Sequence, residues 1–244
     1  MLIAGKTDKG LKRQNNQDSF AVGRFDDISG WAVVCDGMGG ANAGNMASSE
    51  AVKIVSDTIV NNFRLNMSQN SIKHLIDSAI SVANVSVFDL SRSNTDLNGM
   101  GTTIVVAIVV DDLLYIVHAG DSRAYLIDDD NITQLTRDHS IVQSMIEDGK
   151  ITKSEARYHP SRNVITRALG VDENLETDFT VQTFNKNSAL LLCTDGLTNF
   201  VDNDTILNII NNNENVDFAI DLLVDEANKN GGGDNITVVV IKNN

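Results

Sequence analysis

Apolar and polar residues alternate along this chain with two different periods, and each period predicts one kind of element. Short runs of about 5–9 residues, rich in Val and Ile and closed by polar turns, are typical of β-strands. The run 104–110 is apolar at every position, which favours burial on both faces of a sheet. The predicted strands cover residues 2–7, 19–25, 30–36, 102–110, 113–119, 123–127, 178–183, 189–194 and 235–241.

Longer segments repeat their apolar residues every three or four positions, as one face of an amphipathic helix does. These predicted helices cover residues 43–61, 71–90, 202–211 and 216–228. Hairpins replace a regular strand–helix alternation, since the strands 102–110 and 113–119 flank only Asp111 and Asp112. This order favours an α+β fold, a four-layer αββα sandwich in which two stacked antiparallel sheets are flanked by helices.

One polar segment, residues 138–168, interrupts this pattern. It contains two predicted short helices, 140–148 and 153–158, and the only proline of the chain, Pro160. Because it has few periodic apolar residues, we expect it to pack lightly on the core as a mobile flap beside the functional site. No linker or repeat marks a domain boundary, so residues 1–244 are expected to form a single domain with this helical insert.

Composition narrows the class of protein. Hydrophobic residues make up 42% and charged residues 21% of the chain, as in ordinary soluble proteins. No apolar run approaches the roughly 18 residues of a membrane span, and the N-terminus lacks the features of a signal peptide, so a cytoplasmic location is expected. Cys35 and Cys193 lie inside apolar runs and are expected to be small buried side chains rather than a disulfide.

The net charge of −14 argues against a nucleic-acid partner, because phosphate backbones require clustered Lys and Arg. It does not exclude phosphorylated substrates, since bound divalent cations reverse the potential of an acidic pocket. The acidic run from Asp128 to Asn131 lacks the spacing of a calcium-binding EF-hand loop, and a polar hairpin turn is the better interpretation.

Aspartates at or beside strand ends, most of them near glycine, are the main chemical candidates. An aspartate beside glycine places a carboxylate where the backbone can turn sharply and a ligand can approach. Carboxylate and carbonyl oxygens suit Mg²⁺ or Mn²⁺, whereas the four histidines are dispersed, which argues against zinc. These aspartates are Asp18, Asp36, Asp121, Asp195 and Asp234.

The stretch 36–40, Asp-Gly-Met-Gly-Gly, is the strongest motif. Its glycines would let the carbonyl of Gly37 turn toward an ion beside Asp36, although a glycine-rich turn before a helix is the alternative. Arg13 precedes the first of the aspartates by five residues. Its guanidinium could clamp a phosphate through two parallel hydrogen bonds, with an exposed surface arginine as the alternative. His118, on an apolar strand, is expected to be a hydrogen-bonded core residue.

Short motifs follow one another along essentially the whole chain: Arg13 to Ser19, Asp36-Gly-Met-Gly-Gly, Gly101-Thr-Thr, Ala119-Gly-Asp-Ser-Arg, Asp138-His-Ser, His159-Pro, Ala168-Leu-Gly, Cys193-Thr-Asp-Gly-Leu and Gly233-Asp-Asn-Ile-Thr. Any one of them is weak. Together and in this order they resemble bacterial members of the metal-dependent Ser/Thr protein phosphatase family (protein phosphatase 2C-like).

The resemblance implies a set of metal ligands. Asp36 would bridge two Mg²⁺ or Mn²⁺ ions, one of which would also take the carbonyl of Gly37. Asp195 and Asp234 would bind the other ion. Asp18 would act mainly through metal-bound waters.

The resemblance also implies a third, weaker ion held by Asp121 with Asp195, and a grip of Arg13 on the substrate phosphate. A water shared by two cations would attack phosphorus in line, so no phosphoenzyme is needed. Two positions depart from the family pattern. Met38 stands where some members carry a His thought to protonate the leaving oxygen, so a metal-bound water would have to serve. Gln17 stands where many members carry Glu, which weakens an outer contact.

The implied function is hydrolysis of phosphoserine and phosphothreonine in proteins by a cytoplasmic, monomeric enzyme. Its expected partners are a eukaryotic-like Ser/Thr protein kinase and that kinase's substrates, with no nucleic acid and no membrane. One alternative is a catalytically silent relative that binds phosphoproteins, against which the retained Arg13 and aspartates argue. The other is a phosphatase for small phosphomonoesters or one within a regulatory partner switch. The physiological substrate and the metal used in the cell stay open.

Overall fold

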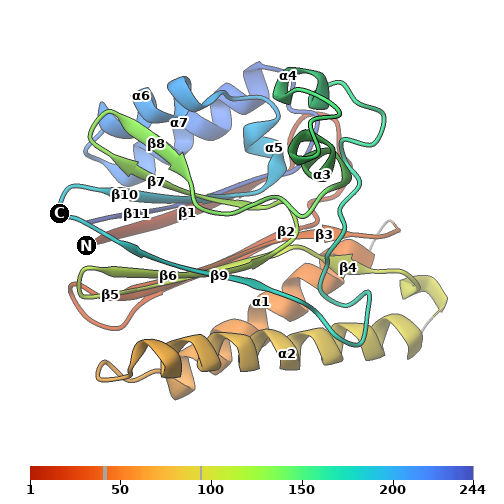
Figure 1. The fold of residues 1–244 in the computed structure, drawn as a ribbon, viewed down its shortest axis with the longest axis horizontal. Helices are drawn as coiled ribbons and strands as arrows, with labels where there is room; N and C mark the ends of the chain where they lie inside the picture. The colour runs from red at the N-terminus through yellow and green to blue at the C-terminus, as the bar shows by residue number, and fades with distance from the viewer. Residues whose placement is uncertain (41–42, 94, 244) are drawn as a thin grey trace.

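Two antiparallel β-sheets stack at the centre of the molecule, with helices on their outer faces (Figure 1). The computed structural model describes residues 1–40, 43–93 and 95–243. In strand order, the first sheet consists of β1 (Leu2–Asp8), β11 (Ile236–Lys242), β10 (Ala189–Cys193), β7 (Arg123–Asp128) and β8 (Asn131–Gln134). The second consists of β2 (Asp18–Arg24), β3 (Gly30–Met38), β5 (Ile104–Val110), β6 (Leu113–Ala119) and β9 (Asp178–Thr183), with β4 (Gly101–Thr102) paired to β3.

Long amphipathic helices complete the outer layers. Helices α1 (Ala43–Asn62) and α2 (Gln69–Ser93) pack on the second sheet, and α6 (Asn203–Asn211) and α7 (Val216–Lys229) pack on the first (Figure 1). The apolar side chains therefore form three layers, one under each helix pair and one between the sheets. The predicted α+β, four-layer αββα sandwich is confirmed.

The central strands contribute to two of these layers at once, which explains their continuous apolar sequence. In β3, Val33 and Cys35 face the helices while Ala32 and Val34 face the other sheet. All residues of β5 are buried in the same alternating way. Each fully buried Val or Ile contributes about 1.5–3 kcal/mol. Both cysteines are free and buried, as predicted.

The strand register gathers one end of several strands at a single edge of the sandwich. Asp18 pairs with Asp36 across β2 and β3, and Ile104 pairs with Ala119 across β5 and β6. In the other sheet the Thr194 N–H, just after β10, donates to the Thr237 carbonyl of β11 at 3.1 Å. The strand ends and loops that carry the predicted aspartates therefore lie together at this edge.

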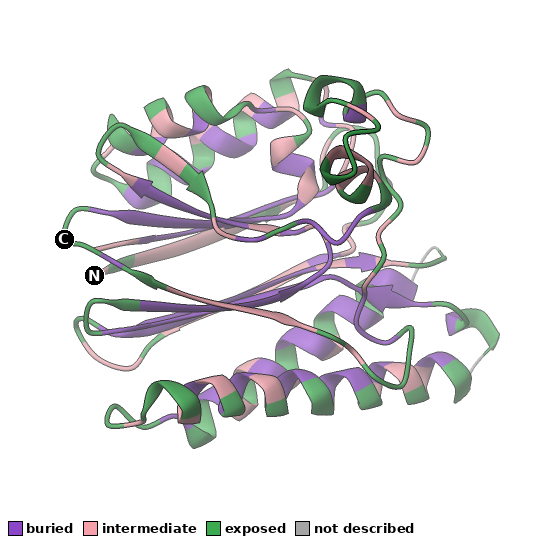
Figure 2. Cartoon of the chain, viewed as in Figure 1, coloured by how far each residue is buried: buried purple, intermediate pink, exposed green. Residues whose placement is uncertain are grey.

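The predicted flap is an excursion between β8 and β9. Its helices are α3 (Ile141–Glu147) and α4 (Lys153–Ala156), capped by the side chains of Ser140 and Thr152. No residue of α3 is buried, so this helix packs lightly on the rest of the molecule (Figure 2). An antiparallel bridge between Ser140 and Ile165 closes its base.

Some elements escaped prediction. β8 has one apolar residue, Ile132, and is otherwise polar, so it gives no strand signal. The short helix α5 (Asp195–Thr198) and the 3₁₀ turn η1 (Thr95–Leu97) are too brief for periodicity to reveal. The acidic run before β8 is a hairpin turn, as predicted, with Asp128 opposite Asn131. Among the described residues, no helix is long and apolar enough to cross a membrane.

Candidate active site

The acidic centre (Asp18, Asp36, Asp121, Asp195 and Asp234) is assembled from strand ends of both sheets. Asp18 and Asp36 are direct cross-strand partners, so their side chains leave the same face of the second sheet. Asp195 begins α5, directly after β10, and Asp234 lies just before β11. In addition to burial, the carboxylates of Asp18, Asp195, Asp121 and Asp234 all raise the pKa of Asp36, so the fold brings these aspartates into one group.

Asp18 is the most enclosed member of the centre, with 5% of its surface exposed. Its Oδ2 accepts hydrogen bonds from Thr194 Oγ1 at 2.8 Å and Thr237 Oγ1 at 2.7 Å. Burial raises the pKa of Asp18 to about 7, against these two hydrogen bonds, which lower it. Its other oxygen, Oδ1, is buried and has no hydrogen-bond partner among the described residues.

For Asp36 and Asp195, burial and the like charge of neighbouring carboxylates act in the same direction, and both raise the pKa. Desolvation raises the pKa of Asp36 well above its usual range, and the Asp18 and Asp195 carboxylates raise it further. Burial, followed by the charge of Asp234, raises the pKa of Asp195 to about 6. Asp195 Oδ2 accepts from Asn199 Nδ2 at 3.0 Å, whereas Oδ1 is buried without a partner in the described part of the chain.

Asp121 stands at the side of the centre, just after β6. Gly120 turns the chain there with φ +108°, a conformation that glycine adopts without strain. Burial and the neighbouring Asp195 raise the pKa of Asp121 to about 7, while Arg123 lowers it. Arg123 itself holds Asp138 through its Nη2 at 2.6 Å, so its charge is already shared with another carboxylate.

The backbone around Asp36 leaves no room for side chains. A Cβ on Gly37 would lie 2.0 Å from the Gly44 carbonyl oxygen in the first turn of α1. The Asp36 N–H donates to Thr103 Oγ1 at 2.9 Å, and its carbonyl accepts from Thr102 Oγ1 at 2.9 Å. The Gly101-Thr-Thr motif therefore fixes the strand end that presents Asp36.

Arg13 is hydrogen-bonded directly to an aspartate of the acidic centre. Its Nη2 donates to Asp234 Oδ2 at 2.7 Å, and this bond raises the pKa of the guanidinium. Half of the Arg13 side chain is exposed, so it can exchange this partner for an incoming anion. The predicted proximity of Arg13 to the aspartates is therefore present.

The donor set of the acidic centre fits hard divalent cations. Several carboxylates are held together by the fold, and two of their buried oxygens, on Asp18 and Asp195, have no hydrogen-bond partner within the part of the chain that the structure describes. A buried, unpaired acceptor is costly, and a cation is the natural partner for an oxygen of this kind. No three of these aspartates, however, offer ligand atoms that all lie within 4.8 Å of one another. A bound ion would therefore need water or carbonyl ligands as well, as Mg²⁺ usually does.

Within the described residues, the one tight group of possible metal ligands is His118, His139 and Asp178. The His118 Nε2–H donates to the Arg137 carbonyl at 2.8 Å, and the two imidazoles stack at 4.6 Å. Arg167 Nη1 lies 2.8 Å from Asp178 Oδ1 and 3.1 Å from His139 Nε2. Because this guanidinium already occupies the cation position, the group is a structural clamp, and His118 is the hydrogen-bonded core residue predicted from the sequence.

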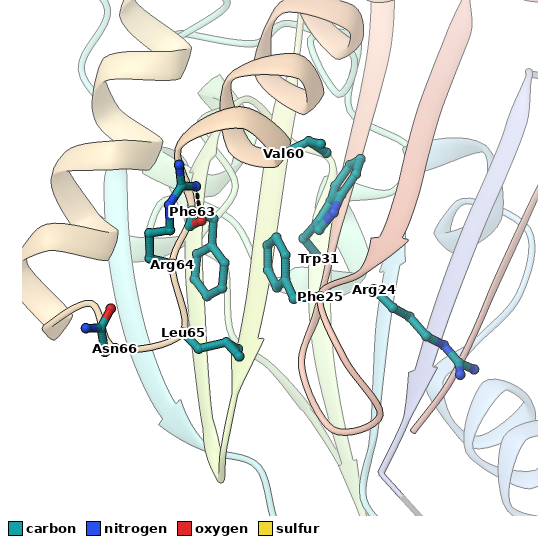
Figure 3. A pocket seen from close by; sticks show the side chains of 8 residues that line it. All are labelled: Arg24, Phe25, Trp31, Val60, Phe63, Arg64, Leu65 and Asn66. Carbon is teal, nitrogen blue, oxygen red and sulfur yellow. Dashed lines mark hydrogen bonds between the residues drawn. The ribbon is translucent and has the colours of Figure 1, made fainter.

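Three polar residues of this site were missed in the sequence. Thr194 and Thr237 orient Asp18, and Asn235 ties the segment around Gln17 to β11, with its Oδ1 accepting from the Gln17 N–H at 2.8 Å. They adjoin the predicted aspartates, but their spacing along the chain gives no hint of their contacts. A hollow of about 530 Å³ lined by Phe25, Trp31 and Phe63 contains no residue of the acidic centre (Figure 3).

Comparison with known proteins agrees with this geometry. The model of the family described as protein phosphatase 2C matches residues 8–236. "Serine/threonine phosphatase stp" from Listeria innocua is 38% identical over 98% of this chain and 94% of its own length. The structure of Stp1 from Staphylococcus aureus has a TM-score of 0.92 at 31% identity, covering 98% of this chain and 94% of that one. The structure of the PstP catalytic domain with two manganese ions has a TM-score of 0.85 at 32% identity, covering 98% and 96%. This chain belongs to the protein phosphatase 2C family.

Proposed function

We propose that the acidic centre uses divalent cations to hydrolyse phosphoserine and phosphothreonine in proteins. Membership of the family makes this chain a metal-dependent protein serine/threonine phosphatase. The observation that supports the role of the centre is the pair of buried oxygens on Asp18 and Asp195 that no described residue hydrogen-bonds. Two core ions, Mn²⁺ or Mg²⁺, fit this donor set.

Each ligand has a distinct role in the proposal. Asp36 would contribute to holding both ions, together with the Gly37 carbonyl at one of them and with Asp195 and Asp234 at the other. Asp18 would act mainly through water. The cations supply Lewis acidity, which activates a water and stabilises charge on the phosphoryl oxygens.

A third, weaker ion is proposed at Asp121 together with Asp195. Their proximity supports this assignment, because the Asp195 charge is the largest electrostatic cause that raises the pKa of Asp121. The positive charge of Arg123 offsets these negative charges only in part, because Arg123 is paired with Asp138.

Arg13 binds the substrate phosphate by giving up its bond to Asp234. A phosphate offers the guanidinium two oxygens, whereas Asp234 offers it one, at 2.7 Å. The exchange fixes the phosphorus atom beside the acidic centre and leaves the Asp234 carboxylate free to bind a cation. Met38 cannot donate a proton to the leaving oxygen, so that proton comes from water.

Residues 1–244 act as one catalytic domain, with 138–168 as a mobile flap beside the site. The enzyme is a cytoplasmic monomer that opposes a eukaryotic-like Ser/Thr kinase and acts on the kinase's substrates. The light packing of α3 supports the flap assignment.

The test is turnover of a phosphothreonine peptide by the purified protein with Mn²⁺. We expect a chelator to abolish turnover because it removes the ions, and Asp36→Asn to abolish turnover because it removes a carboxylate that holds them. Asp57→Asn, at an exposed position of α1, is the matched control and should retain activity. Robust metal-free turnover would contradict the mechanism, and binding of the phosphopeptide without turnover in any divalent cation would indicate a silent relative.

A further inference from the structure

A short basic segment lies beside the acidic centre in a chain that is otherwise strongly acidic. We call residues 9–17 the basic loop. It contains Lys9, Lys12 and Arg13 and no Asp or Glu, whereas the whole chain has a net charge of −14. Clustered charge of one sign at the edge of a site raises the local concentration of oppositely charged ligands.

The basic loop is fixed to the backbone that carries Asp234. The Leu11 and Lys12 N–H groups both donate to the Gly232 carbonyl, at 2.8 and 3.1 Å. Gly10 has φ +74°, and a Cβ there would lie 2.1 Å from the Asp234 carbonyl oxygen. The loop therefore has a fixed position relative to the catalytic centre.

The side chain of Asn235 also holds the basic loop through hydrogen bonds. It is 5% exposed, and its Nδ2 donates to the carbonyls of Lys9 and Asn15, both at 2.9 Å. Its Oδ1 accepts from the Gln17 N–H at 2.8 Å. One buried side chain, adjacent to Asp234, thus holds both ends of the basic loop.

The cations of this region differ in whether they are already paired. Lys6, just before the loop, bonds Asp221 at 2.6 Å, and Arg13 bonds Asp234 at 2.7 Å. Lys9 and Lys12 are exposed and form no ion pair with any carboxylate in the described ranges. Two ammonium groups that are not paired with a described carboxylate therefore precede Arg13 on the same loop.

We propose that Lys9 and Lys12 select phosphoprotein segments with acidic residues close to the phosphorylated Ser or Thr. The inference rests on the proposed function, because Arg13 must hold the phosphate for the lysines to meet the flanking residues. An extended peptide spans about 10 Å in three residues, which matches the range of charge attraction at moderate salt. Acidic residues within about three positions of the phosphate therefore interact with the basic loop.

The test compares three phosphothreonine peptides of equal length that carry Glu, Gln or Lys on both sides of the phosphothreonine. With the Mn²⁺-loaded protein, kcat/KM should fall from the Glu to the Gln to the Lys peptide, by on the order of threefold to tenfold between Glu and Gln. The effect should reside in KM and shrink as salt is added. The double variant Lys9→Gln with Lys12→Gln should bring the Glu-to-Gln ratio of kcat/KM near one. The double variant Lys9→Glu with Lys12→Glu should reverse the preference.

The matched control is Lys53→Gln with Lys186→Gln, which removes two exposed lysines outside the basic loop and should keep the preference of the unmodified protein. Turnover of p-nitrophenyl phosphate normalises every variant for active enzyme. Equal kcat/KM for the Glu and Gln peptides, or a preference that survives in the Lys9/Lys12 variant, would overturn the inference and leave the phosphatase function standing. Failure to hydrolyse any phosphopeptide with Mn²⁺ would overturn the proposed function itself.

Discussion

The acidic centre and the flap are both rich in charge, but the fold treats their charges in opposite ways. In the centre, Asp18 and Asp195 are desolvated beside other carboxylates, and each keeps an oxygen that has no hydrogen-bond partner among the described residues. In the flap, Glu147 is exposed and pairs with Arg137, and Asp148 pairs with Lys150 at 2.8 Å. Charges in the flap are therefore satisfied by water and neighbours, whereas those in the centre require cations.

The difference shows that the acidic centre, and not the flap, lowers the stability of the metal-free protein. Buried like charges raise the free energy of the metal-free native state, and bound cations convert the same arrangement into a binding site. Exposed ion pairs contribute about 0–1 kcal/mol each and leave the flap free to vary. Changes in the two regions should therefore have effects of different size and sign.

The largest expected effect comes from Asp195→Asn. With saturating Mn²⁺, phosphopeptide turnover should fall by about a thousandfold, because a ligand worth several kcal/mol is lost. In chelator, the same variant should unfold about 2–4 °C higher than the unmodified protein, since one repulsive buried charge is removed. Calorimetry and a steady-state assay measure the two effects.

Asp148→Asn in the flap is the matched control for this prediction, because it removes a carboxylate that is exposed and paired. It should change neither quantity appreciably. A metal-free Asp195→Asn protein that is less stable than the unmodified one would contradict the account of the centre as electrostatically strained.

A smaller effect is expected from pH on the metal-free protein. The folded-state pKa is raised to about 7 for Asp18 and Asp121 and to about 6 for Asp195, above the ordinary value of 3.8. Between the ordinary value and the raised values, the native state therefore binds more protons than the unfolded state. The contribution of these carboxyl groups to stability is fully present below about pH 4 and is lost as the pH rises to about 7. The melting temperature in chelator should fall across this window by about 5 °C or more.

Mn²⁺ should flatten this dependence, because cations stabilise the ionised carboxylates. The measurement is a series of thermal melts with chelator and with Mn²⁺ at matched ionic strength. A metal-free protein whose stability rises from pH 5 to 7 would show that other titrating groups outweigh the acidic centre.

The smallest effect on catalysis is expected from the flap. The Thr166 N–H donates to the His139 carbonyl at 2.7 Å, so the two ends of the flap lie together and residues 140–160 can be replaced by a short Gly/Ser link. Turnover of p-nitrophenyl phosphate should change by less than about twofold, whereas the preference among phosphopeptides should change clearly. Equal losses on both substrates would mean that the flap belongs to the catalytic core.

Much of the fold was readable in the sequence because its elements carry strong periodic signals. The all-apolar stretch of β5 predicted a strand buried on both faces, and the stripes of α1 and α2 predicted the helix layer. β8 and α5 escaped because their residues take these conformations through neighbours, β7 in one case and the end of β10 in the other. Local propensity is weak in such short segments.

The residues of the site also differ in how far the sequence predicted them. Aspartates beside glycines identified the carboxylates, since those residue types at strand ends suit a cation site. Thr237 and Asn235 belong to the motif 233–237, but the sequence did not reveal what they contact. Each acts on a residue more than 200 positions away, Thr237 on Asp18 and Asn235 on Lys9.

The sequence was sufficient to predict the two sheets, their helical cover and the identity of the acidic residues, because apolar periodicity and residue chemistry are local properties of the chain. Only the tertiary structure decided which oxygens stay unpartnered, how far burial raises the pKa of each carboxylate, and that the basic loop is fixed beside Asp234. Those properties depend on distances between groups that are remote in sequence, and such distances exist only once the two sheets have stacked.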